Sequence, residues 1–285
     1  MPDYRTVRVG EVLAIARAPD LTLAISLAEQ AGAPRTWYGL GRRMPGPLRL
    51  IVVRGDAQLG GFLHAPVPAW GAGFAVPGAR TVVIRADGGD PIVILRHELA
   101  HFALHDAVPV RVPLWFDEGY AAVAAGEWDR LEALRLNFTV ARGIVPGFFE
   151  LDRSLRASRA DAEAAYALAA SAVTMLARRN PERSLAPLLS RLEAGEGFDA
   201  AVLATTGSPL GRFELEWQKD VRRRFGLLVW VMAGGFWTLA ALAVLAAVWL
   251  RRRRDRPRRA ALDQGWVVEV EDEPPPPSDS TAPAP

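Results

Sequence analysis

The segment from residue 95 to residue 120 most constrains how this chain can fold, because it contains the sequence His97-Glu98-Leu99-Ala100-His101. Side chains four residues apart lie on one face of an α-helix, so His97 and His101 can offer two imidazole nitrogens to one metal ion. Glu98 lies about 100° around such a helix, where its carboxylate can reach a metal-bound water without being a ligand. The spacing therefore predicts a helix over residues 92–105 with a metal-binding face.

The composition limits the ligands and partners that are open to the chain. Its 285 residues include no cysteine, so any zinc ion must be held by histidine and carboxylate side chains. The formal net charge is +2, which gives no basic field of the kind that nucleic-acid binding requires. We therefore expect a His/carboxylate metal site and no nucleic-acid partner.

A catalytic zinc ion usually has three protein ligands and one water, so His97 and His101 need a third partner. His105 follows on the same helix face, but it lies about 12 Å from His97 along the helix axis. One ion with bonds near 2 Å cannot reach both, so we expect His105 to pack or to support the site instead.

Glu118 is the better candidate for the third ligand. A second helix, expected over residues 114–126, could direct this carboxylate at the two imidazoles if it packs on the first helix. Trp115 and Phe116 supply apolar packing, and Gly119 permits a close helix approach. Asp117 is the nearest competitor and should point about 100° away on the same helix.

The apolar pattern of the remaining chain predicts an α+β domain over residues 1–218, sheet-rich over 1–91 and helical over 92–218. Residues 34–47 and 146–154 have the composition of a loop and a turn. Strands are expected within residues 1–18, at 48–53, and as a hairpin of 72–76 with 80–85. Further helices are expected at 21–31, 128–142, 161–179, 185–194, 198–204 and 213–225.

The sequence His97-Glu-Leu-Ala-His101, followed by Pro113-Leu-Trp-Phe-Asp-Glu118-Gly-Tyr-Ala121, resembles the peptidase MA-like, gluzincin-type metallopeptidase domain. The resemblance covers roughly residues 5–215, and its specific part is 95–121. It implies a zincin-like fold, with a small mixed sheet followed by a helical half. It also implies Zn²⁺ held by His97, His101 and Glu118, Glu98 as general base, and a peptide or protein substrate.

The resemblance also points to residues beyond this motif. Well-studied members carry an aspartate four residues after the ligand glutamate, which orients a ligand histidine, whereas this chain has Ala122 there. Asp106 and Asp117 are the candidates to replace it. Related enzymes stabilise the oxyanion with a tyrosine or histidine from the helical half, which makes Tyr166 the candidate here and Tyr120 a second one.

The substrate is expected to lie along the sheet. The loop at residues 71–74 and the strand at 81–85 could form an edge that holds an extended peptide, as sheet edges do in peptide recognition. This expectation rests on analogy with the fold.

Residues 226–250 carry no charge and are long enough to cross a hydrocarbon core of about 30 Å, so they predict one transmembrane helix. The arginine-rich residues 251–259 follow it and favour a cytoplasmic C-terminal side, and the acidic, proline-rich remainder of the 251–285 tail predicts disorder. The catalytic domain would then lie outside the cytoplasm, although no signal peptide is visible at Met1. We expect either a start upstream of Met1 or an exception to the charge rule.

These features together predict a membrane-anchored zinc metallopeptidase. The alternative is a catalytically inactive, membrane-anchored binding or scaffold protein that retains the zincin fold. The presence of Glu98 argues against the alternative, because only turnover needs it. A protease that cuts inside the membrane is disfavoured, because charged residues such as Arg96 and Asp106 crowd the histidine helix.

Overall fold

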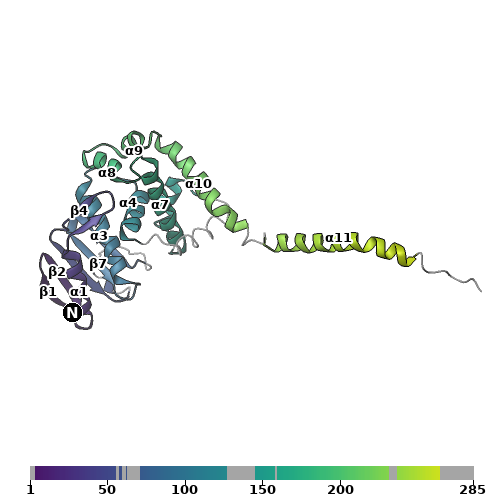
Figure 1. Ribbon diagram of the computed structural model, residues 1–285. Helices are drawn as coiled ribbons and strands as arrows, with labels where there is room; N and C mark the ends of the chain where they lie inside the picture. Colours follow the sequence, from purple (N-terminus) through teal and green to yellow (C-terminus); the bar gives the residue numbers. More distant parts are fainter. Residues whose placement is uncertain are drawn as a thin grey trace, which may run out of the picture. The chain divides into compact units, whose positions relative to one another are not determined.

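The structure is a computed structural model that describes residues 4–55, 58–59, 62, 71–126, 145–157, 159–230 and 236–263. Contacts within the chain separate two compact units, Met1–Trp230 and Val231–Pro285. The first unit contains the sheet, the histidine helix and the other helices around it, whereas the second contains α11 (Figure 1).

The sheet of the first unit is mixed and has five strands in the order β1-β2-β5-β7-β6. Its three middle strands run parallel, whereas the two edge strands, β1 and β6, pair antiparallel. The central strand β5 reads Leu-Arg-Leu-Ile-Val-Val and is buried on both faces apart from Arg49, as expected for a strand with parallel neighbours. The predicted strands and hairpin are confirmed, with bounds β1 Tyr4–Val9, β2 Val12–Arg17, β5 Leu48–Val53, β6 Gly73–Val76 and β7 Thr81–Arg85.

The connection from β2 to β5 contains α1 (Leu21–Gly32) and a short hairpin, β3 (Arg35–Trp37) with β4 (Gly41–Arg43). The expectation of a loop over residues 34–47 was therefore wrong. Strands of three residues are too short to show an alternating pattern. The turn between them depends on Gly39, whose φ is +74° and which lies close to the buried Leu189.

The helical half follows the sheet and contains the two helices that the histidine motif predicted. Residues 146–154, expected as a turn, include the short helix α6, and the expected helix at 128–142 lies outside the described residues. The other predicted helices are confirmed. The described helices are α3 (Pro91–Ala107), α4 (Leu114–Ala125), α6 (Phe148–Ser154), α7 (Arg159–Arg179), α8 (Ala186–Glu193), α9 (Phe198–Thr206) and α10 (Leu210–Trp230).

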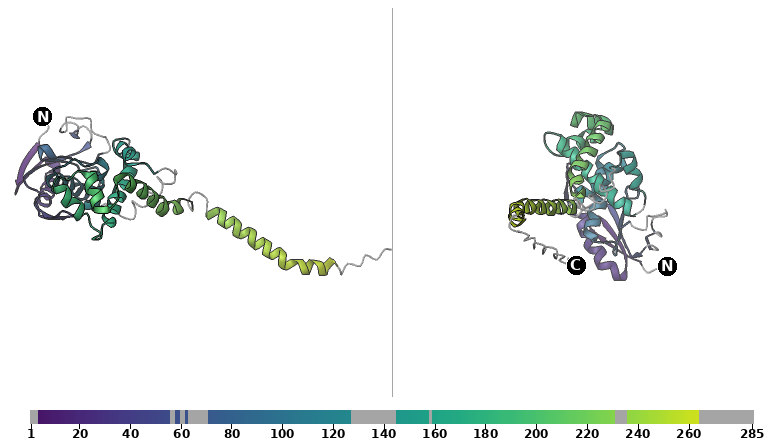
Figure 2. Two further views of the ribbon diagram at one scale, coloured as in Figure 1. Left: turned by 90° about the horizontal axis from the view of Figure 1, so that it is seen from above. Right: turned by 90° about the vertical axis from the view of Figure 1, so that its right-hand side faces the viewer.

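α3 lies between the sheet and the rest of the helical half (Figure 1). It contacts β6 and β7 on one side and α4 on the other, and α4 in turn packs on α7. In the right-hand view of Figure 2, the purple N-terminal strands lie below the teal and green later helices. Fold class is therefore α+β with a small N-terminal sheet and a helical half, as predicted.

Gly119 permits a close helix approach as expected, but the partner is α7. A Cβ atom at Gly119 would lie 2.5 Å from the backbone oxygen of Ala169 and 2.8 Å from the side chain of Val173. No side chain larger than a hydrogen fits this contact without a shift of the helices. The glycine therefore fixes α4 against α7 and leaves the opposite face of α4 to contact α3.

In the second unit, α11 (Phe236–Asp263) begins with uncharged residues up to Leu250 and continues through Arg251–Arg254. Arginine and alanine are good helix formers, so the helix continues past Leu250 into the arginine-rich residues. Among the helices that the structure describes, none combines the length and apolar character that crossing a membrane requires. Residues 231–235 of the predicted span lie outside the described residues.

Candidate metal centre

The polar side chains of α3 that form the site lie on successive turns of the helix. Asp90 caps its first turn by accepting a hydrogen bond from the backbone N–H of Ile92 at 2.9 Å, and Pro91 occupies the first helical position. The rings of His97 and His101 follow on one face, with centroids 5.0 Å apart. His101 and Glu98 are buried, whereas Arg96, His105 and Asp106 of the same helix are exposed.

α4 crosses α3 and brings the acidic side chains of the site. Its N-cap residue, Pro113, offers no side-chain acceptor, so Asp152 of α6 accepts the hydrogen bond of the Trp115 backbone N–H at 2.7 Å. The Trp115 ring stacks on Phe148 of α6 at a centroid distance of 4.1 Å. These contacts fix the first turn of α4, which contains Asp117 and is followed directly by Glu118.

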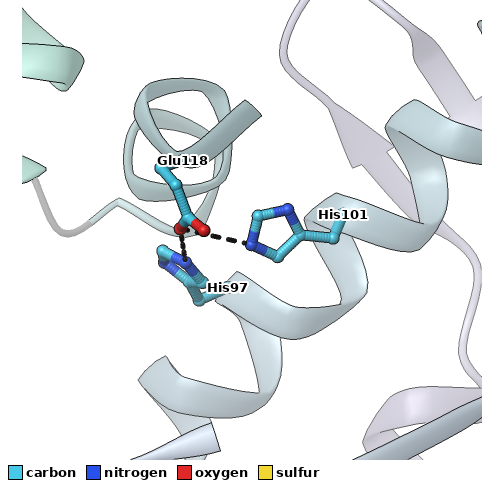
Figure 3. A group of neighbouring side chains, drawn as sticks. All are labelled: His97, His101 and Glu118. Carbon is cyan, nitrogen blue, oxygen red and sulfur yellow. Dashed lines mark hydrogen bonds and ion pairs between the residues drawn. The ribbon is translucent and has the colours of Figure 1, made fainter. Parts of the chain in front are cut away.

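Glu118 lies against both histidines of the motif. Its Oε2 atom is 3.3 Å from Nε2 of His97 and 3.5 Å from Nε2 of His101. Figure 3 shows the two imidazoles from one helix and the carboxylate from the crossing helix turned toward a common point. One ligand atom from each residue lies within 4.8 Å of the others, so the three could hold one metal ion.

Asp117, expected to point elsewhere, lies against the other side of His101. Its Oδ1 atom is 2.7 Å from His101 Nδ1, and its Oδ2 atom is 2.8 Å from His105 Nε2. Asp106, the other candidate for this position, instead forms a bidentate pair with Arg80 at 2.7 and 2.6 Å. The sequence showed the row of histidines and the Asp-Glu pair, but not that Asp117 joins two histidines.

The charges of these groups depend on one another. Burial lowers the pKa of His101, but the carboxylates of Glu118 and Asp117 outweigh burial and hold it well above the usual value. Burial raises the pKa of Glu118, yet His101 and His97 hold it below its ordinary value. Burial also raises the pKa of Asp117, but hydrogen bonds from His101 and His105 outweigh it and lower this pKa to about 2.

The pKa of His105 also depends on Asp117. Its hydrogen bond to Asp117 raises its pKa, although burial opposes the shift. The carboxylates of Asp117 and Glu118 thus favour the protonated, positively charged form of His101, and Asp117 does the same for His105. A divalent cation would supply that charge, and two imidazole nitrogens with one carboxylate are donors that suit zinc.

Glu98 lies on the side of α3 that faces the sheet edge. Its side chain is buried, with the residue 6% exposed, and it lies against Gly73 at the start of β6. A Cβ atom at position 73 would lie 2.7 Å from Oε1 of Glu98, so the strand approaches this carboxylate with its backbone. The sheet edge is therefore β6, whereas β7 at Thr81–Arg85 is an inner strand, contrary to the expected role of that strand.

The two tyrosines considered for the site occupy different places. The ring of Tyr166, on α7, lies 6.0 Å from that of His97 and is half-buried. Tyr120 is fully buried and stacks on Phe116, and its hydroxyl has no hydrogen-bond partner in the described part of the chain. Burial raises the pKa of Tyr120, so its hydroxyl stays neutral. The structure places Tyr166 beside the histidines and Tyr120 in the core.

A mixed sheet, a helix with the His-Glu-x-x-His sequence and a second helix with a facing glutamate define a zincin-like peptidase fold. The chain belongs to the Peptidase MA superfamily, whose family model matches residues 32–223. The match extends from the last residue of α1 into α10 and confirms the peptidase MA-like part of the resemblance seen in the sequence. No curated protein matches the chain significantly. A peptidase domain implies peptide or protein substrates, and metal dependence is general in this superfamily.

Proposed function

We propose that the domain is a zinc-dependent metallopeptidase in which His97, His101 and Glu118 hold the ion. The observation that carries this proposal is the convergence of their three ligand atoms, from two crossing helices, within 4.8 Å. Family membership supports it independently, because it identifies a peptidase domain without reference to these distances. A zinc ion in such a site lowers the pKa of a bound water toward neutrality and polarises the scissile carbonyl.

Glu98 is proposed as the general base. It neighbours His97 in the chain and is buried, and the site needs a carboxylate that accepts the proton of the attacking water and delivers it to the leaving amine. Tyr166 is proposed to donate a hydrogen bond from its hydroxyl to the oxygen that becomes negative in the transition state. Its ring lies beside His97, on a helix that packs against α4.

The alternative, a catalytically inactive binding or scaffold protein, would keep the fold and could keep the metal. It gives no reason for Glu98, because a protein without turnover does not need a base there. The proposed peptidase uses this residue, which is the specific reason to favour it.

Metal analysis of the purified full-length chain tests the ligands. We expect near-stoichiometric zinc, and we expect His101→Ala and Glu118→Ala to lose it. The matched control is Glu29→Gln on the exposed side of α1, which should keep the metal. Zinc retained in Glu118→Ala would contradict the assignment of the third ligand.

Hydrolysis of a mixed pool of unstructured peptides tests the base. Glu98→Gln should keep the zinc content of the wild-type chain and lower turnover by about 10²- to 10⁴-fold. Full activity of Glu98→Gln would show that another group takes the proton. Equal, absent turnover in the wild-type chain and in Glu98→Gln across the pool would favour the scaffold alternative.

We also propose that α11 attaches the peptidase domain to a membrane. Its residues 236–250 carry no charge, and Arg253 lies 5.0 Å over the Trp249 ring at the point where the arginine run begins. An apolar surface beside arginines suits the boundary between lipid tails and anionic headgroups, with the arginines on the cytoplasmic side. The apolar side chains of α11 that are 45–74% exposed are Trp237, Leu239, Leu242, Val244, Leu245, Val248, Trp249 and Leu250.

Flotation of the full-length chain with vesicles of neutral and anionic lipid tests this attachment. The double variant Leu242→Asp/Leu245→Asp should stay with the soluble fraction, because charge is costly among lipid tails. Leu203→Asp on α9 is the matched control, since Leu203 is also exposed and lies in the peptidase domain. Flotation of the double variant equal to that of the control would contradict attachment through α11.

A further inference from the structure

Asp117 lies between two histidines of α3 and has one carboxylate oxygen on each. Oδ1 is 2.7 Å from His101 Nδ1, and Oδ2 is 2.8 Å from His105 Nε2. His101 and His105 are one helical turn apart, which is why one carboxylate can span them. The Asp117 side chain is only 15% exposed, so water competes weakly for these contacts.

The ring of His101 therefore has a different carboxylate on each side. Nδ1 faces Asp117, whereas Nε2 faces Glu118. An ionised carboxylate only accepts hydrogen bonds, so the contact at 2.7 Å requires a hydrogen on Nδ1. A neutral imidazole with its hydrogen on Nδ1 has its lone pair on Nε2, on the side of His97 and Glu118. Asp117 thus selects the form of His101 that can bind a metal ion there.

His105, the last of the three histidines on α3, contacts the other oxygen of Asp117. Its side chain is 42% exposed and too far along the helix to share an ion with His97. By holding Oδ2 it prevents the Asp117 carboxylate from rotating away from His101. The side chain of Ala122 has no polar atom, and Asp106 is paired with Arg80. Asp117 is thus the carboxylate found at His101 Nδ1 in the described part of the chain.

We propose that Asp117 is a positioning residue that fixes the tautomer and ring orientation of His101 for metal binding, and that His105 in turn holds Asp117. This inference rests on the proposed function, because it concerns the same metal site. It assigns a role to His105, the third histidine of the row, which is not among the three proposed ligands.

The test is the zinc dissociation constant of the metal-free, full-length chain, measured against a competing chelator. Loss of a residue that supports a metal ligand typically weakens affinity by 10- to 100-fold. We expect Asp117→Ala near the upper end of that range and Asp117→Asn near the lower end, because asparagine keeps an acceptor for Nδ1 but has no charge. His105→Gln should stay near wild type, since its amide can still donate to Asp117, whereas His105→Ala should weaken binding.

A spectroscopic measurement separates positioning from a loss of folding. The visible spectrum of the cobalt-substituted chain reports ligand geometry, and it should change in Asp117→Ala and His105→Ala but not in His105→Gln. Asp106→Asn is the matched control, because Asp106 neighbours His105 but pairs with Arg80, and it should leave affinity and spectrum unchanged. If Asp117→Ala does not fold, Asp117→Asn and the two His105 variants provide the same comparison.

The outcomes distinguish this inference from the proposed function. A wild-type chain that binds no zinc would overturn both. Zinc binding by the wild-type chain, with affinity and spectrum unchanged in the Asp117 variants, would overturn the inference and leave the three ligands in place. An affinity loss in His105→Gln as large as in His105→Ala would overturn the role of His105 as a hydrogen-bond donor to Asp117.

Discussion

The two helices of the metal centre place their side chains in different ways. α3 presents His97, His101 and His105 at fixed steps of one turn, so the helix itself sets their spacing. α4 presents Asp117 and Glu118 as chain neighbours that separate to opposite sides of His101. Their direction depends on how α4 is held, by α6 at its first turn and by α7 along its length. A site of this kind is therefore as rigid as the packing of its second helix.

The largest loss of stability is expected from a substitution at the contact between α4 and α7. Gly119→Ala places a methyl group 2.5 Å from the Ala169 backbone oxygen, which forces the helices apart. We expect a loss of about 3 kcal/mol in the free energy of unfolding, measured by denaturant titration of the metal-free chain. Gly211→Ala on α10 meets no atom within 4 Å and should instead stabilise by about 0.5 kcal/mol. Equal effects of the two variants would show that the α4–α7 contact is not tight.

A smaller effect is expected at the contact between α3 and α4, where the contribution of Asp117 to stability depends on pH. The folded pKa of Asp117, about 2, lies below its unfolded value, so its contribution is present above pH 4 and is lost as pH falls through 2. The shift corresponds to about 2 kcal/mol. Asp117→Asn should therefore flatten the fall in stability of the metal-free chain between pH 4 and pH 2. An unchanged acid slope would mean that Asp117 is not paired in the folded state.

The smallest effect concerns the start of α4. Asp152→Ala removes the acceptor of the Trp115 N–H and should cost about 1 kcal/mol of stability. Burial raises the pKa of Asp152, so the charge itself is not favoured and the neutral Asp152→Asn should preserve most of the stability. Thermal unfolding of both variants gives the comparison. A loss in Asp152→Asn as large as in Asp152→Ala would show that the charge is what matters.

The difference between α3, which sets the spacing of its side chains by itself, and α4, which depends on packing, explains what could be predicted from the sequence. His97, Glu98 and His101 follow from local spacing, and α3 and α4 were predicted from the pattern around them. The convergence of Glu118 with the histidines was expected from a second helix packed on the first, and the resemblance of the whole motif to a known domain implied the same ligand. Asp117 was named with Asp106 as a candidate to orient a ligand histidine, but its contact with both His101 and His105 was not predicted. That contact depends on the angle at which two helices cross, and no local pattern encodes this angle.

Elements without a long repeat were also missed. β3 and β4 have three residues each and α6 has seven, so none shows a clear period. Gly119 was recognised as a point of close approach, but the sequence could not tell α3 from α7 as its partner. Tyr166 was chosen by resemblance, and the structure places its ring beside His97, although its role stays a prediction.

The contact of Glu98 with Gly73 has a consequence for substrate choice under the proposed function. The edge strand β6 meets this carboxylate through its main chain, with no side chain between them. A peptide that extends β6 would be held by backbone hydrogen bonds, which are the same for every amino acid. Its distance from the base would then be set independently of its sequence. We therefore expect selection among substrates to come from pockets beyond the cleaved bond, and cleavage to tolerate many residues at the bond itself.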